Sequence, residues 1–222
     1  MKSTPTRGVK QYLKPNAYNQ SELDWTLMTI CFMYVINESR REQNVSDLAF
    51  ITDGAAAVAF LVAGLIDAGV NHCPNEGCFA KNEVQAYNSL SIGNTYFQDG
   101  EVGEEFYYRR ETAHADGPFQ RVWGISASSD GELWAGIGHA YTITNRKQNL
   151  FLQLNAMTGL YEKGSGVDLG GPIEFRSGLS VGYQNKAGVR MSLSIDHRSN
   201  LGLYSDNPGL ETVQFRVSIP TK

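Results

Sequence analysis

One periodic feature constrains this chain more than any other: from about residue 81 to the end, apolar side chains recur at every second position. Side chains two residues apart in a β-strand project to the same face, so the pattern predicts strands with one apolar face. Short turn sequences such as SSDG and NKAG separate the periodic segments. The predicted strands are Val84–Tyr96, Glu104–Ala113, Phe119–Ser128, Glu132–Ile143, Asn149–Tyr161, Pro172–Gln184, Val189–Ser199 and Glu211–Ile219.

The number and succession of these strands favour a closed sheet. No segment of helical period and length interrupts them, and 18 of the 23 glycines follow residue 82, so the chain divides near residue 80. An even number of consecutive antiparallel strands is what an up-and-down barrel needs, and closure removes both sheet edges. A β-sandwich is compatible with the same strand count.

The two faces of the predicted strands indicate which solvent surrounds the sheet. In Glu132–Ile143 and Pro172–Gln184 one face is mostly apolar, whereas the other carries small and polar residues together with Trp134, Glu174 and Arg176. A water-soluble barrel buries its large apolar side chains, whereas a membrane barrel turns them towards lipid. We therefore predict an all-β fold, an eight-stranded antiparallel up-and-down membrane β-barrel, with a soluble barrel or sandwich as the alternative.

The first 80 residues differ from the remainder in having two short apolar runs, Trp25–Ile36 and Ala55–Ile66. Both are shorter than the roughly 20 residues that a membrane-spanning helix needs. We expect residues 1–80 to be an N-terminal extension or a signal-like segment of uncertain structure, and residues 81–222 to be the barrel domain. A start codon assigned too early, a long signal segment and a genuine N-terminal domain all remain compatible with this sequence.

Charge and cysteine content exclude several classes of protein. Nineteen Lys and Arg residues face 23 Asp and Glu residues, so no basic surplus is available to neutralise a nucleic acid, and we expect no nucleic-acid partner. Of three cysteines, Cys73 and Cys78 lie close enough for a local disulfide, with two free thiols as the alternative. His72 beside them is only a weak zinc pattern, and we expect no metal or organic cofactor.

The chemistry of the sequence is concentrated in its last two predicted strands. His197 and Ser199 continue the apolar row of Val189–Ser199, and Glu211 begins the apolar row of the next strand, after the loop 200–210. If His197 or Ser199 opposes Glu211, their Cβ atoms lie about 5 Å apart. A hydroxyl, an imidazole and a carboxylate are the parts of an acyl-transfer site. The alternative is that the strand has left the hydrocarbon at residue 197 and that these are ordinary residues at headgroup level.

The final part of the chain resembles a known family, the lipid A 3-O-deacylases of Gram-negative outer membranes (PagL type). The sequence His197-Arg-Ser199-Asn200, followed by Glu211 twelve residues after the serine, matches the motif of that family, and so do NLGL and NPG in the loop between them. The resemblance covers about the last 50 residues well and the preceding 90 in strand pattern.

The resemblance implies an outer-membrane esterase that removes the 3-O-linked hydroxyacyl chain of lipid A, with lipopolysaccharide as substrate. It assigns Ser199 as nucleophile, His197 as general base, Glu211 as the partner of the histidine, and Asn200 as a stabiliser of the oxyanion. The alternative is a noncatalytic small barrel, either structural or lipid-binding, with a vestigial site. With both barrel ends in the periplasm, we expect the loop 200–210 to lie outside the cell.

Overall fold

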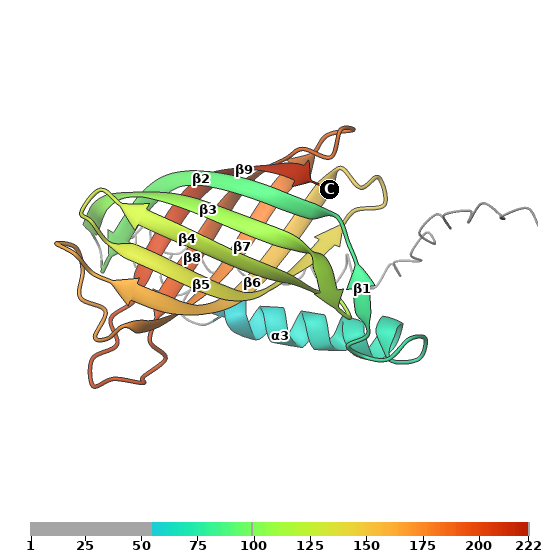
Figure 1. Ribbon diagram of the computed structural model, residues 1–222, viewed down its shortest axis with the longest axis horizontal. Helices are drawn as coiled ribbons and strands as arrows, with labels where there is room; N and C mark the ends of the chain where they lie inside the picture. Colours follow the sequence, from blue (N-terminus) through green and yellow to red (C-terminus); the bar gives the residue numbers. More distant parts are fainter. Residues whose placement is uncertain (1–54, 99, 222) are drawn as a thin grey trace, which may run out of the picture. The chain divides into compact units, whose positions relative to one another are not determined.

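The structure is a computed structural model that describes residues 55–98 and 100–221. In this part of the chain, eight antiparallel strands, β2 to β9, form a closed barrel, each pairing with its neighbour in sequence (Figure 1). The barrel closes where β9 returns to β2, with Thr221 opposite Ala86. The strands are β2 Ala86–Phe97, β3 Gly100–Asp116, β4 Phe119–Ser128, β5 Leu133–Thr144, β6 Leu150–Glu162, β7 Ile173–Gln184, β8 Arg190–Ser199 and β9 Leu210–Thr221. The predicted fold class is confirmed.

Strand β3 is the one whose predicted bounds differ most from the structure. The other seven begin and end within two residues of their predicted bounds, but β3 is extended at both ends, to Gly100 and Asp116. A short strand that the sequence did not predict, β1 (Lys81–Glu83), pairs with the last three residues of β3, so that Lys81 lies opposite Asp116. This extra partner accounts for the C-terminal extension of β3, whereas the N-terminal extension, from Gly100, pairs with the end of β2.

The outer face of the barrel is apolar, as the alternation predicted. Leu133, Ile137, Leu193 and Phe215 lie on this face, and each is at least 45% exposed. Their immediate neighbours in sequence point inward, and Trp134, on the opposite face of β5 from Leu133, is 2% exposed. Large apolar side chains on the outside and a filled interior are typical of a small barrel in a membrane.

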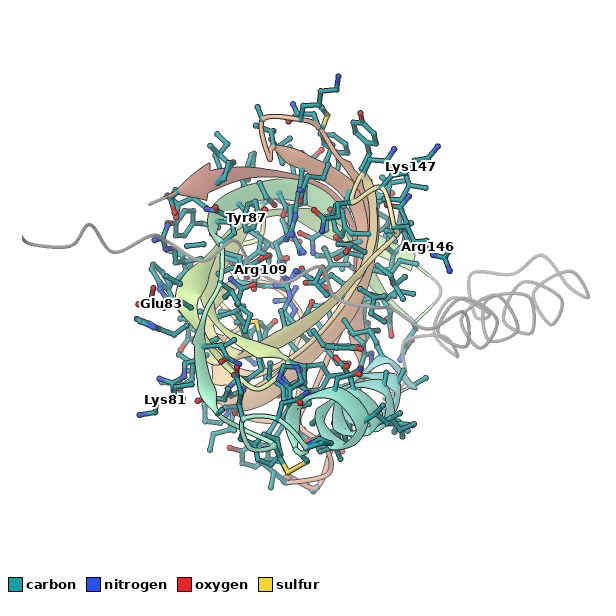
Figure 2. The ribbon with its side chains drawn as sticks, turned by 90° about the vertical axis from the view of Figure 1, so that its right-hand side faces the viewer. Lys81, Glu83, Tyr87, Arg109, Arg146 and Lys147 are labelled. Atoms are coloured by element: carbon teal, nitrogen blue, oxygen red, sulfur yellow. A yellow bond between two sulfur atoms is a disulfide. The ribbon has the colours of Figure 1, made fainter. Side chains whose placement is uncertain are left out.

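The interior of the barrel contains a network of buried ion pairs. Arg176 contacts both Glu105, at 2.7 Å, and Asp196, at 2.8 Å, and Arg198 lies 2.7 Å from Glu105. Figure 2 looks along the barrel and shows its interior filled with side chains, with Arg109 among them. Arginine 109 forms its own pair with Glu111 at 2.6 Å. These charges satisfy one another across the barrel, which fixes the positions of the strands that carry them.

The second apolar run forms a helix, α3 (Ala55–Asp67), that packs on the outside of the barrel. Its contacts are with β5, β6 and β7, and Figure 1 shows it lying along the wall. Phe60 inserts between Tyr141 and Leu154 and meets Phe119 at a ring separation of 5.1 Å. Glycine at position 64 lets the helix come this close, because a Cβ there would lie 2.2 Å from the Phe119 ring.

A short cross-linked segment joins α3 to the first strand. After the π-helical turn η1 (Ala68–His72), Cys73 and Cys78 form a disulfide. The carbonyl of Ala80 then accepts a hydrogen bond from the Gly117 N–H in the β3–β4 turn.

By length and composition, the stretch Ala55–His72 is long and apolar enough to cross a membrane. The first apolar run, Trp25–Ile36, and Cys31 lie outside the described residues.

Candidate active site on the outer wall

The register of the last hairpin brings two of the expected site residues into direct contact. His197 in β8 lies opposite Glu211 in β9, and the His197 Nδ1 and Glu211 Oε1 atoms are 3.0 Å apart. A carboxylate only accepts hydrogen bonds, so Nδ1 carries the hydrogen in this pair and Nε2 is the basic atom of the neutral ring. Both residues are buried, at 5% and 8% exposed. This arrangement fixes the orientation and the tautomer of the imidazole.

Ser199 stands on the same face of β8, one pleat beyond His197. It lies opposite Phe175 in β7 and is 7% exposed. Same-face neighbours on one strand are about 6.6 Å apart at their Cα atoms. Ser199 and His197 are therefore neighbours on the outer face of β8.

A glycine in the loop between β8 and β9 makes room for the imidazole. A Cβ added at Gly209 would lie 2.6 Å from His197 Cε1 and 3.4 Å from Nδ1. The sequence matched this residue only as part of the NPG motif, and the structure supplies its physical reason. Any larger residue would press on the edge of the ring between its two nitrogens.

Asn200 is buried within the loop that follows β8. Its amide nitrogen donates to the carbonyls of Leu169, at 2.8 Å, and Asp206, at 2.7 Å. Its amide oxygen accepts from the Gly202 N–H at 2.9 Å. The side chain thereby ties the β8–β9 loop to the β6–β7 loop, and both amide hydrogens are engaged in doing so. The expected contact of this side chain with an oxyanion stays a prediction.

The structure adds a second serine that sequence reasoning did not select. Ser177 in β7 lies directly opposite His197, on the side away from Glu211, and is 7% exposed. The alternation placed Ser177 on the outer face, but only the register between β7 and β8 shows that it neighbours the imidazole. Two hydroxyls therefore flank His197, one on each of two strands.

A groove in the outer wall contains His197, Ser199 and Ser177. Its volume is about 800 Å³, and its lining comes from β3 to β8, from Leu201 after β8 and from Ala57 of α3. Trp123, Ile137 and Phe175 provide much of its apolar surface. In the part of the chain that the structure describes, no group of three or more His, Cys, Asp or Glu side chains is placed to hold a metal ion. The groove therefore presents hydroxyl and imidazole groups at an apolar surface.

The fold and this site define a class of protein: a small outer-membrane β-barrel with polar reactive groups on its lipid-facing wall. Residues 94–220 match the family model of lipid A 3-O-deacylase (PagL), and the chain belongs to that family. The family and the barrel place the protein in the outer membrane of a Gram-negative bacterium. The resemblance seen in the sequence is thus confirmed.

Two solved membrane proteins align with the chain at low sequence identity, and the first of them shows the same fold. A crystal structure of the outer-membrane enzyme PagL aligns with a TM-score of 0.51 and 17% identity, covering 61% of this chain and 99% of that one. Neisserial surface protein A aligns with a TM-score of 0.44 and 14% identity, covering 64% of this chain and 99% of that one. No curated protein sequence matches the chain significantly.

Proposed function

We propose that this protein is an esterase that hydrolyses the 3-O-linked hydroxyacyl chain of lipid A with a Ser199, His197 and Glu211 triad. The observation that carries the proposal is the 3.0 Å contact between His197 and Glu211, in line with Ser199 on the lipid-facing wall. A histidine and a carboxylate are costly on such a wall unless they satisfy one another. Membership in the lipid A 3-O-deacylase family supports the choice of substrate.

In the proposed reaction, the Ser199 hydroxyl attacks the ester carbonyl carbon while His197 Nε2 takes its proton. The tetrahedral intermediate collapses, the protonated imidazole gives its proton to the departing sugar oxygen, and an acyl-serine remains. Water, deprotonated by the same nitrogen, then releases the hydroxy fatty acid and restores the serine. Glu211 holds the ring in its tautomer and stabilises the imidazolium in both steps. No cofactor takes part.

The oxyanion requires hydrogen-bond donors beside Ser199, and a loop amide together with Asn200 is the assignment that the family motif supplies. For its side chain to donate, Asn200 must exchange one of its two carbonyl partners, Leu169 O or Asp206 O, for the substrate. Replacement by alanine then lowers the rate by about 10² or more if the side chain donates to the oxyanion. A smaller loss, with a loosened loop, assigns Asn200 to holding the loop.

The proposed orientation follows from the position of the substrate. With the N-terminal end of β2 and the C-terminal end of β9 in the periplasm, the loop 200–209 faces the exterior. Ser199, at the outer end of β8, then stands in the outer leaflet, where lipopolysaccharide resides. A membrane-impermeant thiol label on a Ser205→Cys variant should react in intact cells, and labelling only after the periplasm is opened would contradict this orientation.

The decisive experiment is mass spectrometry of lipid A after incubation with the purified protein. The wild-type protein should remove a single hydroxyacyl chain, and fragmentation should assign the loss to position 3. Ser199→Ala should remove none, whereas the matched control Ser177→Ala should retain activity, because only Ser199 is assigned as nucleophile. Intact lipid A with the folded wild-type protein would favour the alternative, a noncatalytic structural or lipid-binding barrel.

A further inference from the structure

Helix α3 shares the groove with the site residues, although it lies outside the family match. Ala57, in its first turn, lines the same groove as His197 and Ser199. The family model matches residues 94–220, so this part of the wall comes from a segment that precedes the matched region. The groove therefore has one side made by the barrel and one made by an element particular to the N-terminal part of this chain.

The groove follows a continuous row of paired residues across five strands. Ser199 pairs with Phe175, Phe175 with Thr158, Thr158 with Ile137, and Ile137 with Trp123. Four intervals between neighbouring strands span about 19 Å at the usual spacing. One leaflet of a bilayer contributes about 15 Å of hydrocarbon, half of the usual core thickness. The row that starts at Ser199 is thus long enough to hold one lipid acyl chain.

The chemistry along the row suits hydrocarbon and changes at its far end. Phe175, Ile137 and Trp123 are apolar, and the groove then reaches Arg121, which is paired with Asp116 at 2.7 Å. An ion pair does not favour the entry of an alkyl chain, so the apolar part of the groove has an end as well as a beginning. An acyl chain whose ester lies at Ser199 is the occupant that fits both ends.

Helix α3 is held firmly enough to act as a wall. Phe60 is 6% exposed among Phe119, Tyr141 and Leu154, and Gly64 lets the helix approach the Phe119 ring. The Cys73–Cys78 disulfide closes the segment that follows the helix. A substitution at Ala57 should therefore change the space inside the groove more readily than it displaces the helix.

We propose that α3 forms one wall of the acyl-chain groove and that Ala57 limits the length of the chain that the enzyme cleaves. This inference rests on the proposed deacylase function. The small side chain at position 57 leaves space beside the row that starts at Ser199, and a larger side chain there fills that space. The discrimination arises because a chain too long for the space beside position 57 meets the helix, a steric cost that a shorter chain avoids.

The first test compares two variants of neighbouring helix residues. Ala57→Phe fills the groove, and the matched control Val58→Phe adds a ring at a position that is 61% exposed on the helix surface. Two lipid A preparations that differ only in the length of the 3-O-linked chain serve as substrates. Ala57→Phe should lower kcat/KM for the longer chain relative to the shorter by about tenfold, the size of effect expected from overpacking a single site. Val58→Phe should leave the ratio unchanged.

A second variant guards against loss of folding in the first. Ala57→Gly removes one methyl group from the groove and should shift the preference towards the longer chain. Heat-modifiable migration on gels reports whether each variant has folded. Unchanged chain-length ratios in folded Ala57→Phe and Ala57→Gly would overturn the inference.

A third measurement does not depend on activity. Lipid A with a photoreactive group at the end of its 3-O-linked chain is bound to the Ser199→Ala variant and irradiated, and the labelled peptides are mapped. Label on the peptide that contains Ala57 supports the inference, and label confined to other parts of the wall overturns it. If the wild-type protein cleaves no lipid A but this peptide is labelled, the proposed function fails while the groove assignment stands.

The mature protein must also retain the helix. Intact mass measurement of the protein isolated from outer membranes should include residues 55–72. A mature chain that begins after residue 72 would overturn the inference without touching the proposed catalytic residues, because all of these lie in β8 and β9.

Discussion

Both faces of β8 carry charged or polar residues, but the inner face lies in the closed interior of the barrel and the outer face lines a groove. On the inner face, Asp196 and Arg198 are 1% exposed and are paired with charges from other strands. On the outer face, His197 and Ser199 are also buried, but they line a groove that opens to the lipid side. Burial alone therefore does not separate structural from reactive groups in this barrel. Under the proposed function, the reactive groups are the ones that have access to the groove on the lipid side.

The inner charges are engaged mostly with one another. Arg176, for example, contacts both Glu105 and Asp196, so removing it takes a partner from two buried carboxylates at once. The outer group is smaller: His197 contacts Glu211 at 3.0 Å, and Ser199 lies beside His197 on the same face of β8. We expect substitutions on the inner face to affect stability and substitutions in the outer group to affect the reaction. The following predictions test this division, from the largest expected effect to the smallest.

The largest effect should come from the outer group. Ser199→Ala and His197→Ala should each lower kcat for lipid A deacylation by at least about 10³-fold, and the double variant should be scarcely worse, because members of a triad act as one unit. Glu211→Ala should cost less, because its role is to orient the imidazole. Folding, measured by heat-modifiable gel migration, should be retained in all of them. Near-normal activity of folded Ser199→Ala would remove the nucleophile assignment.

On the inner face, Arg176→Met should lower the free energy of unfolding by about 3–5 kcal/mol, because Glu105 and Asp196 lose their shared partner inside the barrel. Urea titration in lipid vesicles measures this change. Lys186→Met, in an exposed turn, is the control and should be neutral. If Arg176→Met instead abolished activity while stability stayed unchanged, the division between the two faces would be wrong.

Leu193→Arg tests the lipid-facing row below the site. Leu193 is 66% exposed on the outer wall near mid-strand, and a charge there should cost about 2–4 kcal/mol in a bilayer. Leu203→Arg, at a position 57% exposed in the loop after β8, provides the comparison and should cost little. Equal unfolding free energies for the two variants in vesicles would argue against hydrocarbon at Leu193.

The smallest predicted effect lies at Gly209. Alanine there would place its Cβ 2.6 Å from His197 Cε1, so the ring or the loop must shift. We expect kcat to fall by about tenfold while the free energy of unfolding changes little, since a displacement of this size costs positioning of the catalytic base. A large loss of stability with no change in kcat would show that the glycine serves the loop alone.

Much of the fold followed from the sequence because alternation is a local signal. It gave seven strands with bounds within two residues and assigned Leu193 and Trp134 to their observed faces. The C-terminal extension of β3 was missed because its partner, β1, is only three residues long, Lys81–Glu83, and has no apolar alternation. Its existence depends on a pairing partner distant in sequence, which no local pattern specifies.

The candidate site was predictable in its members and less so in its geometry. Alternation put His197, Ser199 and Glu211 on one face, but it left open which of the first two opposes Glu211. The choice depends on the register of the hairpin, which the loop geometry sets. The partners of Asn200 lie partly in another loop, at Leu169, and were therefore out of reach. The contribution of α3 to the groove could not be predicted either, because an apolar run does not indicate which surface the helix will cover.

The placement of Ser199 on the convex side of the barrel also decides how an enzyme of this kind meets its substrate. A lipid reaches such a site by lateral diffusion within the bilayer and has no need to leave it. The relevant concentration is then the mole fraction of substrate in the membrane. Diluting vesicles with buffer at fixed composition should leave turnover per enzyme unchanged, whereas diluting the substrate with another lipid should lower it. The rate at an outer-wall site therefore depends on the surface density of the substrate in the membrane.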